Sequence, residues 1–476
     1  MRYKTIVGLE IHAQLMTNTK AFCSCNNEYG NDPNTNVCPI CLGMPGALPV
    51  LNKSVVDYSI KAGLAFNCDI NKDSKMDRKN YFYPDLTKGY QISQQDTPIC
   101  ENGYIEITGD SGEPKKVGLI RIHMEEDTGK SIHTDDEKTL VDYNRAGVPL
   151  IEIVTKPEIN SGNEAKEFLE SLRATLKYID VSDCKMEEGS LRCDVNVNIV
   201  DTETNTRSTI AEIKNLNSFR AVEKAIEFET NRQIAMLENG ETEVKSTRRW
   251  DDSVEETILM REKLVQEDYR FASEGDLMTV ELSDEDIERI RATLPELIAE
   301  KKARFMSEYD LNDYDATVLT ADRSLSKYYE ELAKVNSNYS LVSNWVINEL
   351  LRRVESEEFT TDEIKFSVSD FNDLLNLVES NKINNNTGKK VFREMFETGK
   401  SPNTIVEEQG LLQISDTSFI EEAVDKVLSD NPQSIIDFKA GKDRALGFLV
   451  GQVMKATKGK ANPQMVNELL SKKMSE

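Results

Sequence analysis

The feature that most constrains the fold of this chain is a short stretch of strict alternation near its start, residues 9–15. The odd positions are apolar, whereas the even positions carry a carboxylate, an imidazole and an amide, from Glu10, His12 and Gln14. A period of two predicts a β-strand with one face in a core and the other in water. A sheet face exposed to water is enough to explain this stretch when it is taken alone. However, the chain has only 3 histidines in 476 residues, and one of them lies here. The polar face is therefore also a candidate functional surface.

The same alternation recurs at residues 119–125, 150–154, 191–199 and 210–214. The polar positions of these stretches are Arg121, His123, Glu125, Glu152, Arg192, Asp194, Asn196, Asn198, Glu212 and Lys214. The opposite positions are apolar, and those of the first stretch are Ile120, Ile122 and Met124. Five such strands predict one curved sheet that rests its apolar face on helices and lines a cleft with its polar face. Clustered carboxylates repel one another unless a cation neutralises them, and such oxygen and imidazole groups suit Mg²⁺ or Mn²⁺. The first hypothesis is a magnesium–nucleotide site on this sheet.

Two close pairs of cysteines follow the first strand, Cys23 with Cys25 and Cys38 with Cys41. Each pair is short enough to hold one tetrahedral ion, and four thiolates in a reducing compartment indicate structural Zn²⁺. Free thiols without a metal are the alternative. The remaining cysteines are scattered and are expected to be small buried hydrophobes.

Residues 77–94 form a loop rich in tyrosine, lysine, arginine and aspartate, which is typical of a substrate clamp or of a well-packed surface loop. Two Gly-Lys-Ser tripeptides, at 129–131 and 399–401, are not phosphate-binding loops. The upstream glycine that such a loop needs is replaced by Met124 and Glu394. If ATP binds, it binds without a P-loop.

The pattern of mixed strands and helices ends near residue 290, and the remainder of the chain is mostly helical in pattern. We predict an α+β fold with a catalytic body over residues 1–290, a helical domain over 291–404 and a small basic helical tail over 405–476. The chain has a formal charge of −26, yet its last residues are net basic. A basic segment at the end of an acidic chain is typical of a site that binds RNA phosphates. The alternative is a helical tail that is exposed to water and binds no RNA. No apolar run is long enough to span a membrane, and the N-terminus enters a strand directly, so we expect a cytoplasmic protein.

Several long motifs together resemble the B-subunit family of the bacterial tRNA-dependent amidotransferases. They are EIHAQL, the two cysteine pairs, DRKNYFYPDLTKGYQISQ, HMEEDTGK, DYNRAGVPLIEIVT, GSLRCDVNVNI and EIKNLNSF. The segment VGQVMKATKGKANPQMVNELL is similar to the C-terminal tRNA-binding module of the same family. The resemblance extends over essentially the whole chain.

The resemblance implies a glutamine-synthetase-like sheet and the repair of mischarged tRNA. ATP would activate the side-chain carboxylate of Glu-tRNA(Gln), or of Asp-tRNA(Asn), as an acyl phosphate, and ammonia would displace the phosphate. The ammonia would come from a separate glutamine-hydrolysing amidase, the A component of the same complex. A small third protein, the C component, would complete a heterotrimer.

The resemblance also assigns roles to individual residues. Glu10, His12 and Glu125 match the Mg²⁺ ligands of the family, and Glu152 and Asp194 are weaker candidates nearby. The positions where ammonia arrives, or where the activated carboxylate lies, would be near Lys79, Lys88 and Asp194. The zinc ligands would be Cys23, Cys25, Cys38 and Cys41. The tRNA contacts would include Lys455, Lys458 and Lys460.

One segment departs from the family pattern. After Asp268-Tyr269-Arg270 the family usually has an aromatic-proline-acid run, whereas residues 271–277 read FASEGDL. The usual role of that segment therefore does not carry over directly.

Two other classes of protein fit the sequence less well. A self-contained ligase acting on a free amino acid would not need the helical third and the basic tail. A zinc-containing RNA-binding scaffold without chemistry would not need a sheet face rich in metal ligands.

Overall fold

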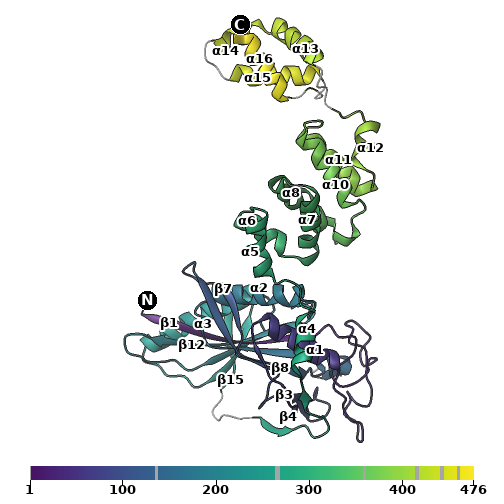
Figure 1. Ribbon diagram of the computed structural model, residues 1–476. Helices are drawn as coiled ribbons and strands as arrows, with labels where there is room; N and C mark the ends of the chain where they lie inside the picture. The colour runs from purple at the N-terminus through teal and green to yellow at the C-terminus, as the bar shows by residue number, and fades with distance from the viewer. Residues whose placement is uncertain are drawn as a thin grey trace. The chain divides into compact units, whose positions relative to one another are not determined.

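The computed structural model describes residues 2–134, 138–262, 269–357, 361–412, 417–439, 444–457, 461 and 463–475. The chain divides into two compact units, residues 1–297 and 298–476. The first unit, coloured from purple to teal in Figure 1, combines a large sheet with helices, and the second is helical. The predicted α+β class is confirmed, whereas the predicted three-part division of the chain stays a prediction. Among the described residues, no helix has both the length and the apolar character needed to cross a bilayer.

One sheet dominates the first unit. In the described part of the chain its strand order is β15-β14-β13-β12-β1-β11-β8-β6-β2, with β7 pairing β8. The long strands are β1 (Tyr3–Gln14), β8 (Pro114–Glu126), β11 (Pro149–Thr155) and β12 (Leu191–Asp201). The others are β2 (Asp69–Ile70), β6 (Cys100–Glu101), β7 (Tyr104–Thr108), β13 (Ala211–Lys214), β14 (Ser246–Asp251) and β15 (Glu256–Glu262). All five alternating stretches therefore lie in the same sheet, as predicted.

The register of the antiparallel strands aligns the polar positions. His12 of β1 lies opposite Glu152 of β11, and His123 of β8 lies opposite the same Glu152 from the other side. On the other edge of β1, Glu10 lies opposite Asp194 of β12. Because paired residues in a sheet point to the same face, these side chains of four strands, β8, β11, β1 and β12, lie on one face.

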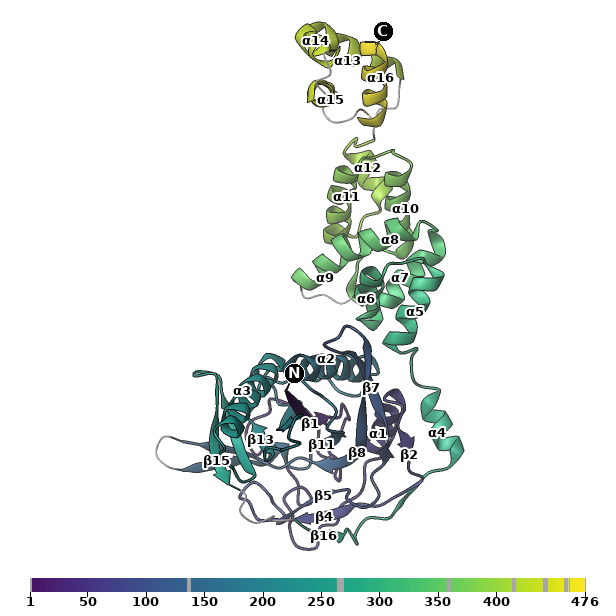
Figure 2. The same ribbon diagram turned by 90° about the vertical axis from the view of Figure 1, so that its left-hand side faces the viewer.

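Helices α1 (Lys53–Ala65), α2 (Gly162–Tyr178) and α3 (Phe219–Glu238) supply apolar side chains to the core of this unit. Figure 2 shows α2 and α3 on one side of the sheet and the smaller sheet β16-β4-β5 on the other. The apolar positions of β1 from Leu9 onward, and Leu15 just after the strand, are buried in the same core cluster as Phe168 and Leu172 of α2. Burial of apolar surface contributes about 25 cal/mol of stabilising free energy per Å². This contribution keeps the apolar face of the sheet against the helices.

One detail of the predicted alternation is wrong. The pattern predicts Ile120 on the apolar face with Ile122, but the Ile120 side chain is 46% exposed while Leu119 is buried. The pairing of β8 with β11 passes directly from Arg121 to Leu119, which leaves Ile120 as the extra residue of a β-bulge. A bulge shifts the alternation by one residue, and sequence periodicity alone does not reveal it.

Three short sheets accompany the main one. They are formed by β4 (Asp77–Asn80), β5 (Tyr90–Ser93) and β16 (Arg270–Ser273), by β9 (Lys130–His133) and β10 (Thr139–Asp142), and by β3 (Asp73–Ser74) and β17 (Val280–Glu281). A 3-10 turn, Tyr143–Arg145, follows β10, and α4 (Asp284–Arg291) begins at a capping box in which Ser283 and Asp286 bond each other's backbone N–H.

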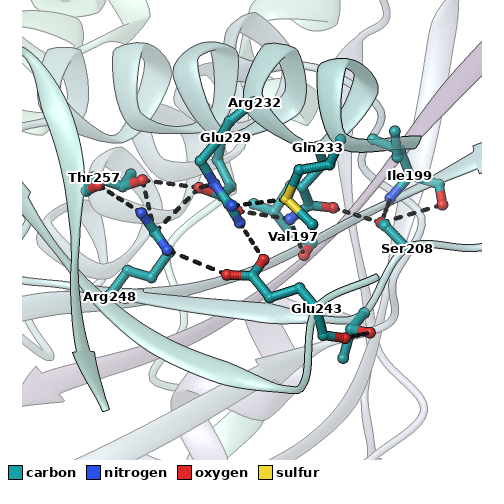
Figure 3. Close-up of polar contacts among 11 residues, drawn as sticks. Val197, Ile199, Ser208, Glu229, Arg232, Gln233, Glu243, Arg248 and Thr257 are labelled. Atoms are coloured by element: carbon teal, nitrogen blue, oxygen red, sulfur yellow. Dashed lines mark hydrogen bonds and ion pairs between the residues drawn. The ribbon is translucent and has the colours of Figure 1, made fainter. Parts of the chain in front are cut away.

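A buried ion network attaches α3 to the edge of the main sheet (Figure 3). The Glu229 carboxylate is fully buried and accepts hydrogen bonds from Arg232 at 2.7 and 3.0 Å and from Gln233 and Thr257 at 2.8 Å. Arg248 of β14 lies 3.5 Å from the same carboxylate and donates to the Thr257 hydroxyl and carbonyl at 2.9 Å. The many partners of Glu229 offset the cost of removing its charge from water.

The helices of the second unit enclose two separate groups of buried side chains, one between Phe305 and Val406 and one between Ile420 and Met474. The first is built from α5 (Ile298–Glu308), α6 (Asp313–Thr320), α7 (Arg323–Val335), α8 (Tyr339–Trp345), a π-helical turn (Val346–Leu351), α9 (Arg352–Glu357), α10 (Val368–Glu379), α11 (Asn385–Thr398) and α12 (Pro402–Glu408). The second is built from α13 (Thr417–Asp430), α14 (Pro432–Lys439), α15 (Arg444–Ala456) and α16 (Pro463–Ser475).

Candidate functional site

Two histidines and two carboxylates from three strands meet on the polar face of the main sheet. His12 Nε2 lies 2.9 Å from Glu125 Oε1 and 3.5 Å from Glu152 Oε2. His123 Nε2 lies 3.2 Å from Glu152 Oε2 and 3.8 Å from Glu125 Oε2. One ligand atom from each of His12, Glu125 and Glu152 lies within 4.8 Å of the others, a set that could hold a metal ion. We call these four residues the sheet-face cluster.

Glu125 carries an unsatisfied oxygen inside this cluster. Its side chain is 2% exposed, and its Oε2 atom has no hydrogen-bond partner among the described residues. The same holds for Nδ1 of His123. An unpaired buried polar atom costs about 1–3 kcal/mol, so such atoms call for an explanation. A divalent cation at Glu125 Oε2 would satisfy this oxygen.

The electrostatics of the cluster are strongly coupled. Burial disfavours the charged form of His12, but the carboxylates of Glu125 and Glu152 outweigh burial and raise the pKa of His12 to about 10. Burial also opposes ionisation of Glu152, yet His123 and His12 hold the pKa of its carboxyl well below the ordinary value. The two imidazoles thus favour the charged form of Glu152, a role that a bound cation would take over when its histidine ligands deprotonate.

Glu10 lies on the same face but outside the set of three ligand atoms. Its Oε1 atom accepts a hydrogen bond of 2.9 Å from Asn196, and burial together with repulsion from Glu152 raises the pKa of Glu10. Of the predicted Mg²⁺ ligands, the structure therefore brings His12, Glu125 and Glu152 together, leaves Glu10 beside them and pairs Asp194 with Lys214.

Lys88 forms a close ion pair with Glu126, the neighbour of Glu125 in β8, and both side chains are largely buried. Glu126 Oε1 also accepts a hydrogen bond of 3.0 Å from the backbone N–H of Ile92. The Lys88 ammonium lies 5.7 Å from the ring centre of Tyr90 and 5.8 Å from that of Phe22. Lys88 is therefore held by an anion and two aromatic rings.

Lys79 of β4 lies among aromatic side chains. Its ammonium is 4.4 Å from the ring centre of Tyr269 and 6.0 Å from that of Tyr81, and the two rings meet edge to face at 5.5 Å. Burial, and then the negative charge of Glu125, raise the pKa of Tyr81. Tyr81, one of the two aromatic neighbours of Lys79, is thus close enough to Glu125 of the sheet-face cluster to be affected by its charge.

Asp194, the third candidate near the reacting groups, pairs closely with Lys214 of β13. Lys214 also lies 3.0 Å from Glu212 Oε1. Burial opposes the charge of Lys214, but Asp194 and Glu212 together raise its pKa. The structure does not bring Asp194 together with Lys79 or Lys88 through any contact among the described residues.

The segment that departs from the family pattern folds onto β4. β16 pairs antiparallel with β4 and places Phe271 opposite Lys79. Glu274 is buried and accepts hydrogen bonds of 2.8 and 2.7 Å from Arg78, which also reaches Asp276 at 2.9 Å. Sequence reasoning missed Arg78 and Glu274. The signal that could have found them is the pair of acidic residues, Glu274 and Asp276, in a segment without the usual proline.

The four predicted zinc ligands come together in one knuckle. The sulfur atoms of Cys23, Cys25, Cys38 and Cys41 all lie within 4.8 Å of one another. The backbone N–H of Cys38 donates to Cys41 Sγ at 3.1 Å, and hydrogen bonding from Cys23 is the main cause that lowers the pKa of Cys41 to about 5. Four converging thiols are the donor set of a closed tetrahedral zinc site.

The cysteine knuckle, residues 23–46, packs directly against the loop that carries Lys88. The Thr87 hydroxyl donates to the Cys41 carbonyl at 2.9 Å. Gly43 has φ +63°, and a Cβ atom there would lie 2.7 Å from Lys88 Cγ. The knuckle therefore supports the backbone and the stem of Lys88.

Comparisons with known proteins cover nearly the whole chain. The family model described as the GatB/GatE catalytic domain matches residues 5–288, and the model described as the GatB domain matches residues 327–474. The chain belongs to the GatB family. It is 51% identical to the B subunit of the aspartyl/glutamyl-tRNA(Asn/Gln) amidotransferase of Clostridium tetani (strain Massachusetts / E88), over 100% of both chains. The protein of the same name from Clostridium botulinum (strain Langeland / NCTC 10281 / Type F) is 52% identical, again over 100% of both chains.

The catalytic-domain model of the GatB family includes both the sheet-face cluster and the cysteine knuckle. The second model includes Lys455, an exposed residue in the last turn of α15. The other two predicted tRNA contacts, Lys458 and Lys460, lie outside the described residues.

Two arginines to which the sequence assigned no role, Arg145 and Arg192, share one buried carboxylate, and Arg192 lies opposite His12 in the sheet. Asp127 accepts from Arg145 Nε at 2.5 Å and from Arg192 Nη2 at 2.7 Å. Arg145 also lines a cavity of about 380 Å³ together with Gln14 of β1 and Asn144. This cavity gives the polar face an adjoining space for a ligand.

Proposed function

We propose that this chain is the component of a tRNA-dependent amidotransferase that activates the side-chain carboxylate of Glu-tRNA(Gln), Asp-tRNA(Asn) or both. Relatives named as components of such an amidotransferase are 51% and 52% identical over their full length. The observation that carries the proposal is the sheet-face cluster, with a buried Glu125 oxygen that has no hydrogen-bond partner among the described residues. A carboxylate is a poor electrophile, and phosphorylation by ATP converts its oxygen into a leaving group that ammonia displaces.

The donor set of the cluster fits Mg²⁺. His12, Glu125 and Glu152 would hold the ion, and Glu10 would approach it from the next polar position of β1. When bound, Mg²⁺ would neutralise the charge that spreads over the phosphoryl oxygens during transfer. The orphaned Glu125 oxygen supports this assignment because carboxylate oxygen is the ligand that Mg²⁺ prefers.

The cationic residues around the cluster would orient the anionic reactants. Lys79 lies between two tyrosines, Lys88 is paired with Glu126, and Asp194 is paired with Lys214. In the proposed reaction these groups line the place where ammonia arrives or where the activated carboxylate lies. Ammonia would come from a partner amidase that hydrolyses glutamine, and a small third protein would complete the heterotrimer.

Two further parts would support the reaction. The cysteine knuckle would bind structural Zn²⁺, for which its converging thiols are a suitable donor set. The third predicted domain, residues 405–476, would bind tRNA phosphates through lysines that include Lys455. Residues 439–476 of this domain carry eight Lys or Arg against three Asp or Glu, a net charge of +5 in an acidic chain, which supports this role.

The substitution Glu125→Gln tests the catalytic proposal. The assembled complex with its partner proteins is given mischarged tRNA, ATP and glutamine, and the amidated aminoacyl-tRNA is measured after nuclease digestion. We expect loss of ATP-dependent amidation with tRNA affinity unchanged. Glu106→Gln, an exposed carboxylate on β7, is the matched control and should keep full turnover. Full turnover by Glu125→Gln would refute the assignment.

A further inference from the structure

Lys20 is a buried ammonium beside the cysteine knuckle. Its side chain is 0% exposed, and Nζ donates to the Asn36 carbonyl at 2.9 Å and lies 3.8 Å from Cys41 Sγ. Lysine is almost never fully buried unless an anion accompanies it. In the parts of the chain that the structure describes, no carboxylate forms an ion pair with Lys20.

The surroundings of Lys20 offer one group that could pair with it as an anion, the sulfur of Cys41. Glu126 lies in the same neighbourhood, since a Cβ on Gly147 would be 3.6 Å from Lys20 Cδ and 3.9 Å from Glu126 Oε2. However, Glu126 pairs with Lys88 through Oε1, which also accepts from the backbone N–H of Ile92, and among the described residues Glu126 forms no ion pair with Lys20. A neutral thiol is only a weak acceptor, whereas a thiolate at Cys41 would carry a full negative charge.

We propose that Lys20 is a positioning residue that compensates the negative charge of a metal-bound four-thiolate knuckle. The inference rests on the proposed zinc site. Four thiolates exceed the charge of Zn²⁺ by two negative charges, and this excess is costly in a dry environment. An ammonium at Cys41 offsets part of it, as outer partners of metal ligands commonly do.

The backbone of Lys20 extends this role to both cysteine pairs. The Lys20 N–H donates to the Cys25 carbonyl at 2.9 Å, while the side chain reaches Cys41 of the second pair. The Asn36 residue whose carbonyl accepts from Lys20 is itself fixed, because its N–H donates to Asn144 Oδ1 at 2.8 Å. Lys20 therefore joins the two halves of the knuckle and holds its charge at the sulfur of Cys41.

Zinc competition measures this effect on the full chain. The wild-type protein and Lys20→Met are loaded with Zn²⁺ and titrated with the colorimetric chelator 4-(2-pyridylazo)resorcinol, and retained zinc is measured by mass spectrometry. We expect Lys20→Met to bind zinc about 10–100-fold more weakly. Lys53→Met, which removes an exposed lysine at the start of α1, should bind zinc like the wild type.

A second measurement separates charge compensation from ordinary packing. Thermal unfolding is followed for both proteins with zinc bound and after zinc is stripped. We expect Lys20→Met to lower Tm only in the zinc-bound form, because the stripped knuckle no longer carries the excess charge. Equal losses of Tm in both forms, or unchanged zinc competition, would overturn the inference about Lys20. A wild-type chain that takes up no zinc would instead overturn the proposed zinc site itself.

Discussion

His12 Nε2 lies 2.9 Å from Glu125 Oε1 although the two residues belong to strands that are not neighbours in the sheet. β11 runs between β1 and β8, and its Glu152 faces His12 on one side and His123 on the other. The carboxylate of Glu125 therefore reaches across an intervening strand. This geometry makes the cluster sensitive to the loss of any one member.

His12→Gln should weaken binding of a divalent ion by at least about 10-fold, because an amide replaces the imidazole at the centre of the cluster. Mn²⁺ titration followed by electron paramagnetic resonance measures the affinity directly. The control is His133→Gln, since His133 is exposed on β9. Equal Mn²⁺ affinity in the two variants would remove His12 from the proposed ligand set.

Gly43→Ala should impair amidation without loss of zinc. The new Cβ would lie 2.7 Å from Lys88 Cγ at a backbone position with φ +63°, so the Lys88 loop must move. Gly46→Ala is the control, because Gly46 also has a positive φ of +84° but a Cβ added there would have no atom within 4 Å. Both variants introduce backbone strain of about 1–2 kcal/mol. Only Gly43→Ala adds the contact with Lys88. Glutamine-dependent turnover and zinc content are measured for both. Equal turnover would show that the knuckle does not position Lys88.

Glu229→Gln should destabilise the first unit by about 3–5 kcal/mol, because Arg232 and Arg248 would lose the buried charge that compensates them. Urea unfolding measured by circular dichroism tests this value. Glu227→Gln, an exposed position on the same helix, should change stability little. A small effect at Glu229 would mean that water or a neighbouring acid satisfies the arginines.

Asp201→Asn should lower Tm at neutral pH but not near pH 2. The hydrogen bond from Arg2 is the main cause that lowers the pKa of Asp201 from 3.8 to about 2. Because the folded-state pKa is depressed, the contribution of Asp201 is complete above about pH 4 and is lost as the pH falls through 2. Thermal scans of both proteins between pH 2 and 7 should converge at the acidic end. A constant difference in Tm across this range would contradict the assignment.

Lys455→Glu should weaken tRNA binding and change the slope of log affinity against log salt by about one or more, as expected when a phosphate contact is lost. Filter binding at several salt concentrations measures both quantities. Lys334→Glu, an exposed residue in the last turn of α7, makes the same charge change outside the predicted tail. Identical slopes for the two variants would exclude Lys455 from the RNA contact.

The sequence predicted much of this molecule because several of its signals are local. Alternation at residues 9–15 is a property of a single strand, and it identified Glu10 and His12 as members of one polar face. The spacing of Cys23, Cys25, Cys38 and Cys41 likewise predicted their convergence, since each pair is too close in the chain to separate. Long motifs carried the family resemblance, which full-length relatives then confirmed.

Only the tertiary structure decided which side chains meet. The strand order places β11 between β1 and β8, which brings His123 into the cluster, and a bulge turns Ile120 outward. Lys88 was predicted near the reacting groups, but its pairing with Glu126 and its support by the knuckle depend on loops far apart in the chain. Periodicity tells which face a residue occupies, whereas its partner across the sheet depends on register and strand order, which arise from packing of the whole unit.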